Sequence, residues 1–225
     1  MDFNNAKYQK QMISVDVALF AIGKDALNVL LVNRGKEPYK GYWSLPGGGL
    51  YNDETAEEAV KRELNEKLNL TGITPCLAGV FSDPHRDSRF RNVSLSYYAL
   101  VDPGNVAFLK NEAKINAVQW FDMSSLPPLA FDHRGILETA LRMLQEKIFD
   151  MTFMKPFLPS TFTLGQLQLI YESILGTNLD KRNFRRKLNA LKCLKEKGQK
   201  NENDPRKKSA LYMLDSIFLI KKDDT

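Results

Sequence analysis

Two glutamates and a lysine, all close together, are the side chains in this sequence best placed to do chemistry. Glu63 and Glu66 are followed directly by Lys67. Because positions three and four apart share one face of an α-helix, a helix here turns all three side chains into one cleft. Clustered carboxylates hold hard divalent cations such as Mg²⁺, which bridge diphosphate oxygens. The lysine opposes that chemistry, since it brings a positive charge to the cation's position and can pair with Glu63.

The residues around this cluster resemble the Nudix box. The matching positions are Gly48, Glu54, Arg62, Glu63, Leu64, Glu66 and Leu70, preceded by Trp43-Ser44-Leu45-Pro46-Gly47. Lys67 stands where the family has a third carboxylate. Asn69 replaces a glycine, but Asn tolerates the left-handed conformation that ends a helix. The resemblance implies an α/β Nudix sandwich, a mixed sheet flanked by helices, whose box is degenerate at Lys67 and keeps Glu63 and Glu66 as vestigial metal ligands.

Lys67 leaves two interpretations open. In active Nudix hydrolases the carboxylates bind metal and one glutamate prepares the attacking water, so the lysine predicts a domain that binds a ligand without hydrolysing it. The alternative is a Mg²⁺-dependent pyrophosphatase that uses other ligands, with Lys67 as a solvated helix charge.

The composition indicates a globular protein. The chain has 225 residues, 43% of them hydrophobic, which is enough for one large domain or two smaller ones. No run approaches the roughly 18 apolar residues that a membrane span requires. Residues 1–11 are polar and carry no signal-peptide core. Cys76 and Cys193 are isolated and predict neither a disulfide framework nor a metal site. We therefore expect a cytoplasmic protein with no membrane partner and no cofactor.

Basic residues are concentrated in the C-terminal third of the chain. Residues 151–225 contain 15 Lys+Arg against 8 Asp+Glu, whereas residues 1–150 are slightly acidic. Most charge runs are merely solvated faces. A density this high, with twelve basic and three acidic residues between Lys181 and Lys208, suggests instead an anionic polymer as partner.

Apolar spacing predicts the elements of the first domain. Strands are expected over residues 13–22, 28–32, 77–82, 92–101 and 117–121, and helices over residues 55–68 and 134–148. The turn residues Gly23-Lys24-Asp25 predict a hairpin between the first two strands. This pattern fits the Nudix sandwich, and we assign residues 1–150 to a ligand-sensing domain.

The remaining residues predict a smaller domain. Pro156 and Pro159 break the pattern, so residues 151–161 are interpreted as a linker. Thr163 and Gln166 form a capping box ahead of one helix, and Asp180 caps a second helix whose buried stripe is Phe184, Leu188, Leu191 and Leu194. A basic segment and a strand over residues 209–214 follow. We assign residues 162–225 to a winged helix-turn-helix domain.

The stretches 162–176 and 179–188 resemble the C-terminal domain of Nudix-related transcriptional regulators, the NrtR family. That resemblance implies a Nudix-like sensor joined to a winged helix. Such a protein acts as a homodimer on a near-palindromic, double-stranded DNA operator, as a transcriptional regulator of the repressor type. In this family the Nudix part commonly senses ADP-ribose, while the AraR branch senses L-arabinose. RNA is a weaker alternative, because no aromatic side chains interleave the basic run.

The second helix of the winged domain carries the candidate DNA-binding residues. Arg182, Arg186 and Asn189 lie opposite its buried stripe, where Arg can read guanine and Asn can read adenine. Phosphate contacts are assigned to Lys181, Arg185, Lys187, Arg206, Lys207 and Lys208. Each of these residues can also be an ordinary surface charge.

Candidate ligand-binding residues surround the degenerate box. They are Arg34, Trp43, Glu63, Lys67, His85, Arg86 and Asp87. Arg86 and Asp87 suit sugar hydroxyls or phosphate oxygens, although a loop ion pair is the plainer interpretation. His85 and Ser88 depart from the Gly-Arg-Asp-Pro-Arg loop of ADP-ribose-binding relatives. Without a good Mg²⁺ site a diphosphate must rely on arginines, so the sequence favours a neutral sugar, L-arabinose, over ADP-ribose.

Overall fold

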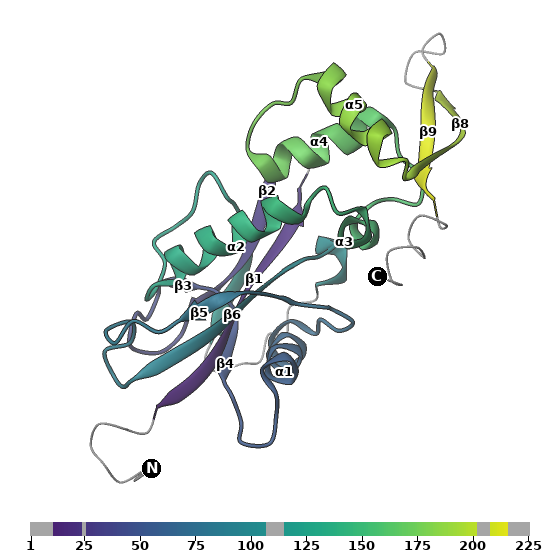
Figure 1. Cartoon of the computed structure of the whole chain (residues 1–225). Coiled ribbons are helices and arrows are strands. Elements are labelled where there is room, and N and C mark those ends of the chain that lie inside the picture. Colours follow the sequence, from purple (N-terminus) through teal and green to yellow (C-terminus); the bar gives the residue numbers. More distant parts are fainter. Residues whose placement is uncertain (1–10, 24–25, 107–114, 202–207, 216–225) are drawn as a thin grey trace. The chain divides into compact units, whose positions relative to one another are not determined.

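A mixed sheet of seven strands is the framework of the first of two units into which the chain divides (Figure 1). The computed structural model describes residues 11–23, 26–106, 115–201 and 208–215. Residues 1–23 and 27–143 form the first unit, and residues 24–26 and 144–225 form the second. The division between these two units falls inside helix α2 (His133–Lys147), and the domain boundary at residue 150 stays a prediction.

Strand β1 lies at the centre of the sheet. The strands are β1 (Met12–Ile22), β2 (Leu27–Arg34), β3 (Trp43–Ser44), β4 (Gly47–Gly49), β5 (Cys76–Phe81), β6 (Asn92–Leu100) and β7 (Ile115–Asp122). Their order is β3-β2-β1-β6-β5, with β4 also paired to β1 and β7 to β2. The β1–β6 pair is parallel and the others are antiparallel. Residues 14–21 of β1 are buried because the sheet is covered on both faces.

Two helices cover opposite faces of this sheet, α1 (Ala56–Leu68) and α2 (Figure 1). Val15, Val17 and Leu19 belong to one apolar cluster with Val60 and Leu64 of α1. Successive strand residues point to opposite faces, so the intervening residues of β1 face away from α1. The short 3₁₀ helix η2 (Pro103–Asn105) completes the described elements of this unit.

The ends of α1 follow from local hydrogen bonds. The Thr55 side chain accepts from the Glu58 backbone N–H at 3.2 Å, and the Glu58 carboxylate accepts from the Thr55 N–H at 2.8 Å. Such a capping box satisfies backbone donors that the first turn leaves unpaired. Asn69 ends the helix with φ of 48°, which confirms the left-handed conformation predicted for it.

The second unit begins with helical structure where the sequence predicted a linker. Residues 151–161 contain α3 (Met151–Met154) and the 3₁₀ helix η3 (Lys155–Phe157), and Met151 and Met154 are buried. Two local features explain why part of the predicted linker is helical. Asp150 caps α3 by accepting from the Thr152 N–H, and a proline is tolerated at the start of a helical turn, where no N–H partner is needed.

Two helices and a hairpin form the remainder of this unit. They are α4 (Leu164–Leu175), α5 (Lys181–Leu191), β8 (Leu194–Asn201) and β9 (Lys208–Leu214), with β8 and β9 antiparallel. The predicted caps Thr163 and Asp180 are confirmed. Helix α5 ends earlier than predicted because Lys192 adopts a left-handed conformation, so Leu194 begins β8 instead of extending the helix. In the part of the chain described, no helix is long and apolar enough to cross a membrane.

Candidate functional site

A cavity of about 600 Å³ opens in the first unit beside α1. Its basic lining residues are Arg34, Lys36, Arg62, Lys67, Arg86 and Arg89. Its carboxylates are Asp16, Glu37, Glu63, Glu66 and Asp87. This volume falls in the range of small-molecule and cofactor sites. The lining has one more cation than anion, so the cavity suits a polar ligand of nucleotide size that carries negative charge.

The glycines of β4 let the strand approach Glu63 closely. A Cβ atom added to Gly48 would lie 1.9 Å from Glu63 Oε1, and one added to Gly47 would lie 2.2 Å from the Val15 carbonyl oxygen. A side chain at position 47 would collide with the backbone of β1, and one at position 48 would displace the Glu63 carboxylate. A strand at these glycines is not expected from the sequence, because glycine is usually depleted in strands.

Arg62 joins the carboxylates of the box. Its Nη2 atom lies 2.6 Å from Glu54 Oε1, its Nη1 atom lies 2.7 Å from Glu63 Oε1, and its guanidinium lies 3.9 Å from the centre of the Tyr51 ring. The hydrogen bond to Glu54 raises the pKa of Arg62, and the same bond lowers the pKa of Glu54. Glu54 is therefore held as a carboxylate, and the same arginine forms an ion pair with Glu63.

Lys67 occupies the other side of Glu63. Its Nζ atom lies 2.5 Å from Glu63 Oε2 and donates a hydrogen bond to the Gly47 carbonyl oxygen. The two oxygens of Glu63 are thus engaged by two different cations. Mg²⁺, which the Nudix fold implies, requires free oxygen ligands and does not fit this donor set. Among the described residues, no group of three or more His, Cys, Asp or Glu side chains is arranged to hold a metal ion.

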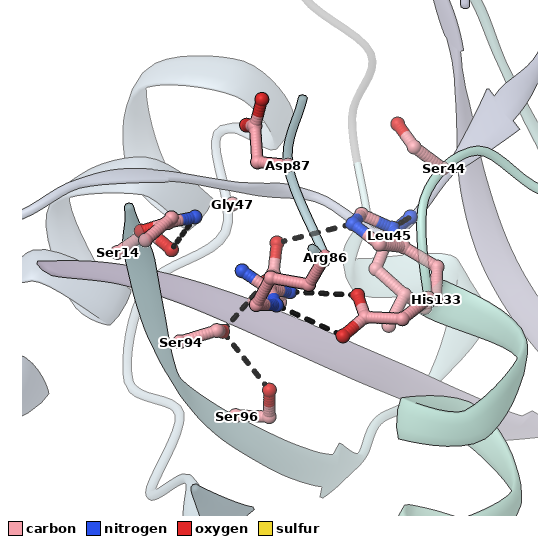
Figure 2. Close-up of polar contacts among 12 residues, drawn as sticks. Ser14, Ser44, Leu45, Gly47, Arg86, Asp87, Ser94, Ser96 and His133 are labelled. Carbon is pink, nitrogen blue, oxygen red and sulfur yellow. Dashed lines mark hydrogen bonds and ion pairs between the residues drawn. The ribbon is translucent and has the colours of Figure 1, made fainter. Parts of the chain in front are cut away.

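Arg86 anchors a buried polar cluster in the cavity wall (Figure 2). Its Nε and Nη2 atoms each lie 2.8 Å from an oxygen of Asp132, and Nη2 lies 3.4 Å from Asp16. Ser94 donates to the same Asp16 oxygen at 2.6 Å. Burial opposes the charged form of Arg86, but the hydrogen bonds to Asp132 and the charge of Asp16 outweigh it and raise the Arg86 pKa. The arginine is held as a permanent cation.

His133 connects this cluster to the approach segment of the box. Its Nδ1 atom accepts a hydrogen bond from the Leu45 backbone N–H at 2.9 Å, so that nitrogen carries no proton. Its Nε2 atom lies 3.6 Å from Asp16. Burial lowers the pKa of His133 despite the neighbouring Asp16 carboxylate. The ring is therefore neutral at ordinary pH, and it fixes the position of Leu45.

Arg34 lies in the cavity without a carboxylate partner among the described residues. Its Nε donates to the Pro38 carbonyl oxygen at 3.0 Å, and its guanidinium lies 4.7 Å from the centre of the Phe131 ring. Burial and the nearby charge of Arg89 lower the pKa of Arg34. Asp87 instead pairs with Arg89, at 2.9 and 2.7 Å. Arg34 is thus a cation that forms no ion pair among the described residues, so an anionic group of a ligand can bind it.

Five of the seven candidate ligand-binding residues lie together in this cavity: Arg34, Glu63, Lys67, Arg86 and Asp87. Trp43 and His85 fall outside its lining. The Trp43 ring packs edge-on against Phe121 at 4.6 Å, and His85 is exposed beside Asp83.

The cavity also has lining residues that are not among the candidates from the sequence, and these include Asp16, Asn92, Phe131 and His133. One signal was available for Asp16, because it is a carboxylate within the apolar run of β1. The other three are distant from the box in sequence, and only the tertiary fold brings them next to it.

The second candidate site is the exposed face of α5. Phe184 and Leu188 are buried, while the predicted DNA-binding residues of this helix are exposed: Lys181, Arg182, Arg185, Arg186, Lys187 and Asn189. A shallow groove runs along Arg182, Arg185, Arg186 and Asn189, together with Asp180 and Asn183. Those four residues follow the spacing of a single helix face. Arg185 therefore shares a face with the residues assigned to base contacts.

The other predicted DNA-binding residues are placed differently. The Nζ atom of Lys187 lies 5.3 Å from the centre of the Phe149 ring, away from the groove. Arg206 and Lys207 lie outside the described residues. Lys208 is placed as the first residue of β9.

Both units match known protein families. Residues 10–140 match the NUDIX domain, and residues 155–214 match the NrtR DNA-binding winged helix domain. Over 193 residues the chain is 34% identical to the ADPR-responsive transcriptional repressor NtrR of Acinetobacter baylyi, covering 83% of this chain and 75% of that protein. Over 126 residues it is 37% identical to the ADP-ribose pyrophosphatase of Methanocaldococcus jannaschii, covering 56% of this chain and 73% of that enzyme.

Solved structures of Shewanella oneidensis NrtR are also similar. The crystal structure of that protein with a 27mer DNA superposes with a TM-score of 0.74 at 28% identity, covering 92% of this chain and 95% of that one. The structure of its NUDIX domain with ADP ribose superposes with a TM-score of 0.57 at 31% identity, covering 64% of this chain and 94% of that one. A Nudix domain is followed by this winged helix, and a relative with 34% identity is matched over three quarters of its length; the chain therefore belongs to the NrtR family of Nudix-related transcriptional regulators.

Proposed function

We propose that this protein is a transcriptional repressor whose Nudix cavity binds ADP-ribose without hydrolysing it and whose α5 helix binds operator DNA as part of a homodimer. The observation that carries the sensing role is the arrangement around Glu63. The positively charged side chains of Arg62 and Lys67 each form an ion pair with one of the two Glu63 oxygens. Hydrolysis would require a metal ion at this carboxylate. The cavity keeps the size and polarity of a ligand site without the means to activate water through Mg²⁺.

The charge of the cavity supports ADP-ribose over L-arabinose, the effector that the sequence alone favoured. Arg34 has no carboxylate partner among the described residues, and an anion satisfies it better than a neutral sugar does. Asn92 is buried in the lining, and its Oδ1 atom has no hydrogen-bond partner in the described part of the chain; a ribose hydroxyl supplies the missing donor. Three of the similar proteins reported above are named for ADP-ribose or solved with it, whereas none of them is named for arabinose.

The exposed face of α5 supports DNA binding. Arg182, Arg186 and Asn189 line one groove, and their side chains have the donors that read purine edges in the major groove. Asp180 caps the helix N-terminus by accepting from the Asn183 N–H, so the first turn of α5 is fixed. The helix thus presents a rigid basic surface.

Helix α2 supports a connection between the two activities. Asp132, the residue just before it, is bound by the cavity residue Arg86, and the last turn of the same helix belongs to the second unit. A ligand that binds one arrangement of Arg86 and Asp132 better than another shifts the population of DNA-binding states.

The experiment is fluorescence anisotropy of a labelled duplex, selected from a random-sequence library with the full chain. We expect ADP-ribose to change the apparent Kd for the duplex about 5- to 150-fold, the usual span of allosteric coupling. L-arabinose at the same concentration should leave it unchanged. An unchanged Kd with ADP-ribose would remove it as the effector.

A second candidate function is a Mg²⁺-dependent pyrophosphatase. Its support is that Glu54, Arg62, Glu63 and Glu66 all keep their positions in the box and that the Methanocaldococcus jannaschii enzyme is similar. Incubation of the protein with excess ADP-ribose and Mg²⁺ separates the two functions. The sensing role predicts less than one turnover per chain, whereas multiple turnover would establish the enzyme.

A further inference from the structure

The Lys67 ammonium is a fixed cation with one donor left unused. A lysine ammonium has three N–H groups. One faces Glu63 Oε2 and another is donated to the Gly47 carbonyl oxygen. Among the described residues no acceptor takes the third. Lys67 lines the cavity, and 14% of its side chain is exposed.

Two separate parts of the chain hold this ammonium in place. Glu63 lies one helical turn before Lys67 on α1, and Gly47 lies in the neighbouring strand β4. Glu63 is itself fixed by Arg62, which also bonds the Gly49 carbonyl oxygen at 3.0 Å. A side chain restrained in this way loses little further rotamer freedom when it binds a ligand.

From this geometry we propose that Lys67 takes the place of the divalent cation in recognition of the diphosphate. Its remaining N–H donates to a diphosphate oxygen of the ligand, so the cavity binds a nucleoside diphosphate sugar without Mg²⁺. Lysine serves as a point-charge ligand for phosphate in other protein sites. The inference rests on the proposed function, because it names how the same cavity recognises ADP-ribose.

A tethered cation and a bound Mg²⁺ differ in a measurable way. Mg²⁺ has to be recruited from solution and requires nearly ideal octahedral geometry, so affinity that depends on it falls when a chelator is added. The ammonium is covalently attached and always present. It also repels a divalent cation from Glu63 and Glu66, which excludes simultaneous binding.

The first test is calorimetric titration of ADP-ribose into the full chain, once with EDTA and once with Mg²⁺. We expect the two Kd values to agree within about twofold, since no metal takes part. If the Kd is at least tenfold higher in EDTA than in Mg²⁺, a loss of about 1.4 kcal/mol or more in binding free energy, this inference is overturned. ADP-ribose would remain the effector in that case.

The second test replaces the ammonium. Lys67→Gln should weaken ADP-ribose binding roughly 10- to 100-fold, the loss expected for a charge-assisted hydrogen bond. Adenosine, which has no phosphate, should bind both forms equally. Lys61→Gln is the matched control, because Lys61 is exposed on the same helix and does not line the cavity. Equal ADP-ribose affinity for Lys67→Gln and wild type would contradict the role of Lys67.

The third test needs no nucleotide. Lys67→Glu places a third carboxylate beside Glu63 and Glu66, so we expect this variant to bind Mn²⁺, measured as loss of the free Mn²⁺ paramagnetic resonance signal, whereas wild type leaves the signal unchanged. The proposal would be contradicted if wild type bound Mn²⁺. It would also be contradicted if a Lys67→Glu variant with a normal circular dichroism spectrum bound no Mn²⁺. If wild type does not bind ADP-ribose, ADP-ribose is not the effector. The third test alone then decides whether Lys67 occupies the position of the divalent cation. If Lys67→Glu does not fold, the first two tests decide.

Discussion

Arg86 and Asp132 are joined at two points, with the Nε and Nη2 atoms of the arginine each 2.8 Å from a different oxygen of the carboxylate. Arg86 lies in the loop between β5 and β6, and Asp132 immediately precedes α2. The Arg86 side chain is only 3% exposed, whereas that of Asp132 is 29% exposed. The pair therefore ties the wall of the cavity to the beginning of the helix on which the second unit continues.

Removing the charge of Asp132 should destabilise the fold. In Asp132→Asn the buried guanidinium of Arg86 loses the negative charge and one of the two acceptor oxygens opposite it, and its remaining carboxylate is Asp16 at the longer distance. We therefore expect the free energy of unfolding to fall by about 2 kcal/mol in urea titrations. Glu138→Gln is the matched control. The Arg134–Glu138 pair lies on the surface, with both side chains more than half exposed, and its loss should cost less than about 1 kcal/mol. Equal losses in the two variants would contradict the anchoring role of Asp132.

Burial of neutral His133 should make stability sensitive to acid. In the unfolded chain a histidine titrates near pH 6.5, and in the folded protein burial lowers the pKa of His133. Below about pH 6.5 the unfolded state therefore binds more protons, and the free energy of unfolding falls as pH falls toward the lowered value. His133→Asn, which keeps an acceptor for Leu45, should lose this component, whereas variant His85→Asn at the exposed histidine should retain it. Identical pH profiles for wild type and His133→Asn would rule this explanation out.

Substitutions at different residues of α5 should affect DNA binding in different ways. Arg186→Ala should cost about 1–3 kcal/mol on the selected duplex and relax the preference for one base pair, because Arg186 is assigned to a base edge. Lys181→Ala should weaken binding to all duplexes and reduce the slope of log affinity against log salt by about 1, as expected for a phosphate contact. Arg134→Ala, which removes an exposed arginine in the first unit, is the control. A salt-independent affinity of the wild type would exclude the phosphate contacts altogether.

A side chain at position 48 should lower the free energy of unfolding. The Cβ atom of Gly48→Ala would lie 1.9 Å from Glu63 Oε1, so either the strand or the Glu63–Lys67 pair must shift, at a cost of about 1–3 kcal/mol in unfolding free energy. Gly135→Ala is the comparison, because its Cβ meets no atom within 4 Å and it lies in α2. That change should instead raise stability by about 0.5–1 kcal/mol. A Gly48→Ala variant as stable as wild type would show that this close approach is dispensable.

Features fixed by local hydrogen bonds could be predicted from the sequence. Thr55, Thr163 and Asp180 cap their helices through residues three positions away, and Asn69 needs only its own tolerance of a left-handed backbone. The pairing of Glu63 with Lys67 likewise follows from helical spacing. Such contacts depend on a few neighbouring residues, so their signal is present in the chain order itself.

Contacts that depend on distant residues could not be predicted. His133 meets the Leu45 N–H across 88 residues, and Ser94 meets Asp16 across 78, so neither pairing leaves a local pattern. The strand at Gly47–Gly49 forms against the usual preference of glycine because β1 and Glu63 leave no room for a side chain. The helix α3 was hidden by the prolines that follow it, one of which stands at the start of η3.

The most direct test of the central claim is a calorimetric titration of ADP-ribose into the full chain with Mg²⁺ present, followed by chromatography of the mixture. Binding without hydrolysis predicts a saturable heat signal near one ligand per chain and recovery of intact ADP-ribose. The absence of binding heat, or AMP in excess of the protein, would contradict it.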